Sequence, residues 1–104
     1  MTGRVDLPNK YLGELKPITF DFSDLLAVGE TISTQVVAAT VYSGTDASPS
    51  SLISGSATAS GAVVTQKVTA GTVGVIYELL CTITTSSTNT YQKVGLLAVI
   101  PDEL

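Results

Sequence analysis

The sequence contains no histidine, no tryptophan and only one cysteine among its 104 residues. Histidine and cysteine supply most protein ligands of zinc, and histidine is the most frequent base beside a catalytic nucleophile. A single cysteine also excludes an intrachain disulfide, so we expect the fold to form without an oxidising compartment. Because most metal-dependent and nucleophilic chemistry is thereby removed, we expect no catalytic residue, no metal site, no cofactor and no enzymatic activity.

Charged residues are also scarce, at 13 % of the chain, and the formal net charge is −4. The basic residues are spread along the sequence rather than clustered: Arg4, Lys10, Lys16, Lys67 and Lys93. Proteins that bind nucleic acids draw most of their affinity from basic patches that neutralise phosphates. We therefore expect no direct contact with DNA or RNA.

Long apolar runs are missing as well. None approaches the roughly 20 residues that a membrane-crossing helix needs, and residues 1–11 lack the apolar core of a secretory signal. Hydrophobic residues still make up 44 % of the chain, which is enough to exclude disorder. The surface that remains is rich in Ser and Thr and lacks the charges that keep strand edges apart. We take this as a first indication that other protein subunits cover part of it.

What the chain does contain is short stretches in which apolar and polar residues alternate, separated by Gly, Pro, Asn and Ser. This period of two is typical of strands with one buried face. The expected strands cover residues 18–23, 32–42, 56–60, 62–69, 75–85 and 91–100, the last broken or bulged at Gly95. Strands at this spacing predict an all-β fold, an immunoglobulin-like β-sandwich of about seven antiparallel strands.

Residues 1–17 show no such alternation and include Pro8 and Pro17. We interpret them as an extended N-terminal arm, followed by the sandwich at residues 18–104. The arm is a candidate docking element because an extended segment can bind along a partner's groove or strand edge. Its candidate contact residues are Arg4, Val5, Leu7, Tyr11 and Leu12.

The expected core follows from the inward positions of the strands and from the corner after residue 22. Its fold-defining members are Phe20, Phe22, Leu25, Val37, Val41, Tyr77, Leu79, Cys81 and Ile83. Aliphatic neighbours raise the pKa of a thiol, so Cys81 is predicted to be a small core residue; an intersubunit disulfide is the alternative. Tyr77 is predicted to form the tyrosine corner of such sandwiches, with a ligand-contacting aromatic as the alternative.

The remaining acid–base candidates are the carboxylates Asp21, Asp24 and Glu30. A hydrolase with paired carboxylates needs two of them in one cleft, and their spacing does not require that arrangement. The chain also lacks the Asp-x-Asp-x-Asp-Gly loop of common calcium sites. We therefore assign these residues to a polar strand face and a turn cap.

Three phrases carry a family resemblance: FDFSDLLAVGETI at residues 20–32, VYSGTDASPSSLISGSATASGAVVTQKVTAGTVGVIYELLCTITTS at 41–86, and GLLAVIP at 95–101. Together they resemble a family of small virion proteins of tailed bacteriophages, described as fiber–tail adaptors or immunoglobulin-like structural proteins. The resemblance extends over about residues 18–101 and does not include the arm. Its marks are core and turn residues, so it specifies the fold family.

The resemblance implies a non-enzymatic structural protein of the virion, assembled in the host cytoplasm and present in multiple copies per particle. Its role would be to attach tail fibers or tailspikes to the tail or neck, so its partners would be those virion proteins, with no membrane and no small-molecule substrate. Multivalent mounting would convert weak single contacts into firm attachment.

Two alternatives remain open. A capsid decoration, or cement, protein would use the same fold and also lack catalytic chemistry. A carbohydrate- or receptor-binding module would need exposed aromatic side chains, for which Tyr11, Tyr42 and Tyr91 are the candidates.

Overall fold

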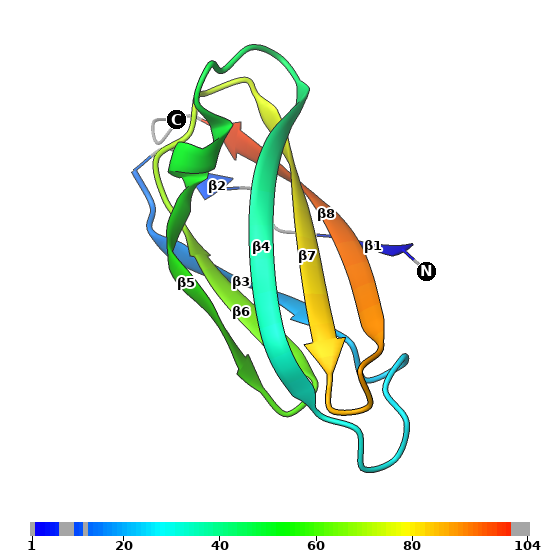
Figure 1. Cartoon of the computed structure of the whole chain (residues 1–104). Helices are drawn as coiled ribbons and strands as arrows, with labels where there is room; N and C mark the ends of the chain where they lie inside the picture. The colour runs from blue at the N-terminus through cyan, green and yellow to red at the C-terminus, as the bar shows by residue number, and fades with distance from the viewer. Residues whose placement is uncertain (1, 7–9, 12, 101–104) are drawn as a thin grey trace.

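The computed structural model describes residues 2–6, 10–11 and 13–100, and these residues form an all-β fold (Figure 1). The strands are β1 Thr2–Asp6, β2 Lys10–Tyr11, β3 Lys16–Asp21, β4 Ile32–Ser43, β5 Ile53–Ser60, β6 Val63–Val68, β7 Ile76–Thr85 and β8 Thr90–Ile100. One short 3₁₀ turn, η1 Pro49–Leu52, precedes β5. Within the described part of the chain, no helix is long and apolar enough to span a membrane.

The strands form two sheets, with the orders β1-β8-β7-β4 and β3-β6-β5, and β2 also pairs with β8. All pairings are antiparallel except those of β1 and β2, which run parallel to β8. Since β1 and β2 pair with successive parts of β8, they act as one interrupted edge strand. The prediction of an immunoglobulin-like sandwich is confirmed. The edge formed by β1 and β2 is the one place where the predicted antiparallel pairing is replaced by parallel pairing in the described residues.

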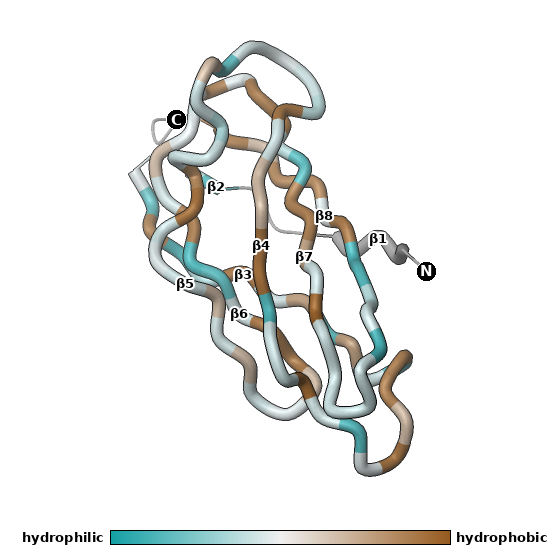
Figure 2. Tube along the Cα trace, viewed as in Figure 1, coloured by the Kyte–Doolittle hydropathy of each residue, from teal (hydrophilic) through white to brown (hydrophobic). Residues whose placement is uncertain are grey.

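The core lies between the sheets and is built by alternation. Along β7, Tyr77, Leu79, Cys81 and Ile83 are each fully buried, and the residues between them are partly exposed. The opposite sheet contributes Phe20, which is also fully buried. Figure 2 shows mostly apolar or neutral colours along β4 and β7, because each strand has a single strongly hydrophilic residue. A strand pair of this composition buries one face against another apolar layer.

The other expected core positions differ in depth. Phe22 is fully buried and Val37 is 6 % exposed, whereas Leu25 and Val41 are only partly buried and pack against the edge of the core. Leu25 belongs to the turn after β3, where its backbone N–H donates to the carbonyl of Phe22. A turn at the end of a sandwich is covered from one side only, so its apolar residues remain partly exposed.

The expected break at Gly95 was wrong. Gly95 pairs with Leu79 of β7 and with Val5 of β1, and neither ladder shifts its register there. A residue with a partner strand on each side cannot bulge without breaking both ladders. The register shifts lie instead in β5, between Ser54 and Thr58, and at the two ends of β4.

The N-terminal segment is less separate from the sandwich than the division at residue 17 suggests. β1 and β2 add to the outer edge of β8, and β3 already begins at Lys16. Strands of five and two residues are too short to show a period in the sequence, and they form because the edge of β8 offers unpaired backbone groups. The assignment of residues 1–17 to an arm stays a prediction about its role.

The loop between β6 and β7 depends on Gly71, and this generates a first prediction. Gly71 has φ +92, and a Cβ there would lie 2.8 Å from Cγ2 of Val99 and 3.1 Å from Cδ1 of Leu52. Gly61 also has positive φ, at +59, but nothing lies within 4 Å of the position its Cβ would take. Gly71→Ala is expected to lower the free energy of unfolding by about 3 kcal/mol, and Gly61→Ala by about 1 kcal/mol.

Chemical denaturation of the two variants beside the unaltered protein measures this difference. Equal losses at the two positions would show that the loop around Gly71 moves aside, and the packing described above would then be wrong.

Candidate docking surfaces

The carboxylates predicted to be polar face and cap residues are bound to neighbouring backbone and side-chain groups. Asp21 accepts a hydrogen bond from the backbone N–H of Ser23 at 2.9 Å, which holds the pKa of Asp21 below its usual range. Asp24 pairs with the ammonium group of Lys93 at 2.7 Å, and this contact lowers the pKa of Asp24. Both residues therefore stabilise the turn after β3.

Glu30 has a similar role in the loop before β4. Its carboxylate accepts hydrogen bonds from the hydroxyl of Thr85, the backbone N–H of Ala27 and the side-chain amide of Asn89, and these contacts lower its pKa. Among the described residues, no group of three or more Cys, Asp or Glu side chains is arranged to hold a metal ion. Asp21, Asp24 and Glu30 therefore hold the loops around them in place through hydrogen bonds and an ion pair.

Cys81 lies on the inner face of β7, and its side chain is fully buried. Burial raises the pKa of its thiol to about 12. Reaction as a nucleophile or ligand requires the thiolate, which is scarcely populated near neutral pH at such a pKa. Cys81 therefore packs in the core as a protonated thiol near neutral pH.

Tyr77 connects two loops at one end of the sandwich. Its hydroxyl donates to Oδ2 of Asp46 at 2.6 Å and accepts from the backbone N–H of Thr72 at 2.7 Å. Thr72 belongs to the loop before β7, so this contact is the tyrosine corner of the fold. The bond from Tyr77 lowers the pKa of Asp46, while burial and then Asp46 raise the pKa of Tyr77. Tyr77 is a residue that the sequence indicates, whereas Asp46 as its partner is seen only in the structure.

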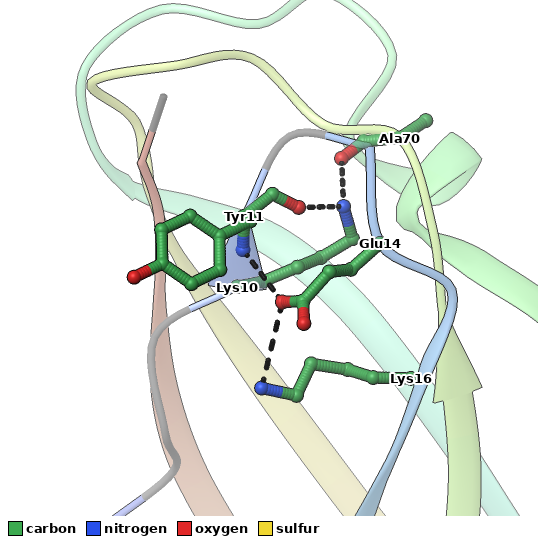
Figure 3. Close-up of polar contacts among 5 residues, drawn as sticks. All are labelled: Lys10, Tyr11, Glu14, Lys16 and Ala70. Atoms are coloured by element: carbon green, nitrogen blue, oxygen red, sulfur yellow. Dashed lines mark hydrogen bonds and ion pairs between the residues drawn. The ribbon is translucent and has the colours of Figure 1, made fainter. Parts of the chain in front are cut away.

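Lys10 makes a buried contact that the sequence does not indicate. Its side chain is fully buried, and its ammonium group donates to the carbonyl oxygens of Tyr11 and Ala70, each at 2.8 Å (Figure 3). Ala70 lies in the same loop as Thr72. A buried ammonium group is stable only where oxygen atoms replace its water, so Lys10 fixes β2 to this loop. No local signal in the sequence distinguishes it from the four other basic residues.

The segment after β2 is held by a second set of contacts, also drawn in Figure 3. Oε1 of Glu14 accepts from the backbone N–H of Tyr11 at 2.8 Å and lies 3.7 Å from the ammonium nitrogen of Lys16. The ring of Tyr11 points away from these polar groups and is 40 % exposed. This part of the expected arm is therefore fixed, with an aromatic side chain available to a partner.

The candidate docking residues fall into three groups. Arg4 and Val5 lie in β1, opposite Val94 and Gly95 of β8, and Tyr11 lies in β2. Leu7 and Leu12 lie outside the described residues. Docking by any of these residues stays a prediction.

Three of the six large apolar side chains that are exposed in the described part of the chain lie at one end of the sandwich. Tyr11, Tyr42 and Val73 are each at least 40 % exposed and lie at the end where Lys10 and Tyr77 fix the loop at residues 69–75. We call this the braced end. Apolar side chains on rigid backbone are well suited to binding because little conformational entropy is lost on contact.

A cleft of about 250 Å³ opens at one side of the sandwich, between β4 and β5. It is lined by Gln35, Val36 and Val37 of β4, by part of β5 and by Gln66. Gln66 is 1 % exposed, and its amide donates to the carbonyl oxygens of Ser54 and Gly55 at the bulge of β5. These bonds satisfy carbonyl groups that the bulge removes from the ladder.

The contact between Tyr77 and Asp46 generates a prediction on acid stability. Because the pKa of Asp46 is lowered in the folded protein, its contribution to stability is present above the unfolded pKa of about 4 and is lost as the pH falls through the lower folded value. Asp46→Asn removes this contribution. The variant is expected to melt at a lower temperature than the unaltered protein at neutral pH, with the difference shrinking toward about pH 2.

Thermal unfolding followed by circular dichroism across this pH range measures the effect. The other carboxylates with lowered pKa values, Asp21, Asp24 and Glu30, remain in both proteins and serve as an internal reference. A difference in melting temperature that stays constant with pH would contradict an ionised Asp46 as the partner of Tyr77.

The chain matches the model of a known protein family. A family model described as "Podophage GP4 fiber-tail adaptor protein gp77" matches residues 10–97, and a search of curated proteins found no match. The matched range begins at Lys10, so it includes the residue that fixes β2 and leaves out β1. It starts earlier than the resemblance at residues 18–101 indicated. Since the match extends over most of the chain, this protein belongs to the podophage GP4 fiber-tail adaptor protein gp77 family.

Proposed function

We propose that this protein is a non-enzymatic adaptor of the virion that attaches tail fibers or tailspikes to the tail or neck. The single observation that carries the proposal is the family match over residues 10–97, which is a match to a structural adaptor. The partners would be other virion proteins, and the site of action would be the particle, after assembly in the host cytoplasm.

The described side chains support this role. Three buried polar side chains bind backbone groups of the same chain: Lys10 binds Ala70, Gln66 binds the bulge of β5, and Lys93 binds the carbonyl of Asp21 at 2.6 Å. The titratable groups are thus used to hold loops in place. A protein of this kind acts through the shape of its surface, and the braced end is the surface that we assign to docking.

The carbohydrate-binding alternative receives no support from the positions of its candidate tyrosines. Tyr91 lies opposite Ile83 and packs partly buried against the core, whereas Tyr42 and Tyr11 lie at the other end of the sandwich. Sugar rings stack on aromatic side chains that share one platform, and these three do not.

A phage that lacks the gene tests the adaptor role directly. Its particles are expected to contain a packaged head and tail but to lack fibers or tailspikes, and added purified protein should restore them. Electron microscopy and mass spectrometry of the particles provide the measurement. Particles that keep their fibers but have unstable heads would favour a cement protein and contradict the proposal.

A second experiment tests the arm. β1 pairs with residues 92–96 of β8, so deletion of residues 1–6 is expected to lower the melting temperature while leaving the domain folded, and to reduce incorporation into particles. The matched control replaces residues 2–6 by a glycine–serine segment of equal length. It separates the effect of the amino-acid sequence on incorporation from the effect of the segment's length. Normal incorporation of the deleted protein, measured by immunoblot of purified particles, would refute docking by residues 1–6.

A further inference from the structure

The strand β4 forms a sheet edge that no other described strand covers. It pairs with β7 along one side, and the sheet order ends there. The opposite edge of the same sheet, on β8, is covered by β1 and β2. The chain thus closes one edge of its larger sheet and leaves the other open.

This open edge also lacks the features that normally prevent strands from pairing between molecules. β4 has twelve residues, ISTQVVAATVYS, without a charge, a proline or a glycine. Its register with β7 shifts only at the two ends, between Ile32 and Thr34 and between Val41 and Ser43, so its middle is regular. Edge strands of monomeric proteins usually carry charges, prolines or bulges for protection.

The three other edges of the sandwich carry such features. β3 contains Lys16, Pro17 and Asp21, and β1 contains Arg4 and Asp6. β5 contains Gly55 and an irregular register between Ser54 and Thr58. Protection is therefore missing at β4 alone among the four sheet edges of the described structure.

The surroundings of β4 leave room for an added strand. The cleft between β4 and β5 lies beside Gln35, Val36 and Val37, so β5 leaves part of this side of β4 open. One side-chain hydrogen bond joins the two strands there, from the amide of Gln35 to the carbonyl oxygen of Ala57 at 3.1 Å. β4 adjoins the strand that carries the tyrosine corner, and in nine-stranded members of this fold the next position is taken by a further strand. Among the described strands of this chain, none takes that position.

The outward face of β4 is apolar or neutral. Val36 is 59 % exposed and Tyr42 is 55 % exposed, and Ala38 lies in a cross-strand row with Leu80 and Val94. An exposed edge of this composition favours an uncharged strand as its partner, because each cross-strand neighbour would lose water on contact.

Among the described edge strands β4 and β5 are uncharged, and of these two only β4 has a regular middle, so a second copy of β4 meets this requirement. A strand that pairs antiparallel with its own copy around Val37 places Thr34 opposite Thr40 of the second copy, and Val36 opposite Ala38. No pair in this arrangement brings like charges together. Two copies with net charge −4 each repel over most of their surfaces, and this strand is where close approach costs least.

We propose that two copies of this chain associate through their β4 edges, antiparallel across a twofold axis, so that the larger sheets join into one continuous sheet. This inference does not depend on the adaptor function. It concerns the oligomeric state of the protein before it binds its partners.

Analytical ultracentrifugation of the full chain, from micromolar to millimolar concentration, tests the proposal. The unaltered protein is expected to shift from monomer to dimer with concentration. Thr40→Lys, at an exposed position of β4, is expected to weaken the dimer by about tenfold or more, because the ammonium group would be desolvated at the joint. The matched control, Thr58→Lys, places the same change on the exposed side of β5 and should leave the dimer unchanged.

A compensating pair tests the register. Thr34→Glu alone should weaken the dimer, whereas Thr34→Glu combined with Thr40→Lys should restore it, since each glutamate would face a lysine of the other copy. Lysine is placed at position 40 because Thr40 lies opposite Glu78 of β7. Circular dichroism confirms that each variant is folded.

A monomer throughout the concentration range would overturn the proposal, and this result needs no variant. A dimer that Thr58→Lys disrupts as strongly as Thr40→Lys would also overturn it, because the contact would then lie on the other sheet.

Discussion

The side chain of Tyr77 imposes the constraint on which the rest of the sandwich depends. Its ring is fully buried in the core, and its hydroxyl reaches two loops, at Asp46 and at Thr72. From this residue on, buried and partly buried residues alternate along β7 without interruption to Thr85. Apolar packing places β7 between two other strands. The hydrogen bonds of the Tyr77 hydroxyl hold the two loops at this end of the sandwich against β7.

Alternation made most of the fold predictable from the sequence. Burial of one strand face is a local requirement, so the positions of β3, β4, β6, β7 and β8 and the inward residues of β7 follow from a period of two. Asp46, Lys10 and Gln66 were not predictable as contact residues, because each binds a group distant in sequence or in an irregular strand. β1 and β2 were missed because an edge strand is stabilised by the backbone of its neighbour, which leaves no pattern in its own side chains.

Three of the four buried polar side chains in the described part of the chain share one physical role. Lys10, Gln66 and Lys93 each donate to backbone carbonyl groups at places where the regular ladder ends or is interrupted. Long side chains can reach such carbonyls and replace the missing strand partner, which removes the cost of burying an unsatisfied acceptor. The scarcity of charge in the sequence is consistent with this use, since these ammonium groups serve internal bonding.

The parallel pairing of β1 with β8 has a mechanical consequence. Five successive residues of β1, from Thr2 to Asp6, lie opposite Gln92 to Leu96. When tension pulls the start of β1 and the end of β8 in opposite directions, the load acts along both strands and stretches all their hydrogen bonds together. An antiparallel hairpin pulled at its open end breaks one bond at a time and resists far less. An extension joined through β1 would therefore transmit force to the whole sheet before it detached.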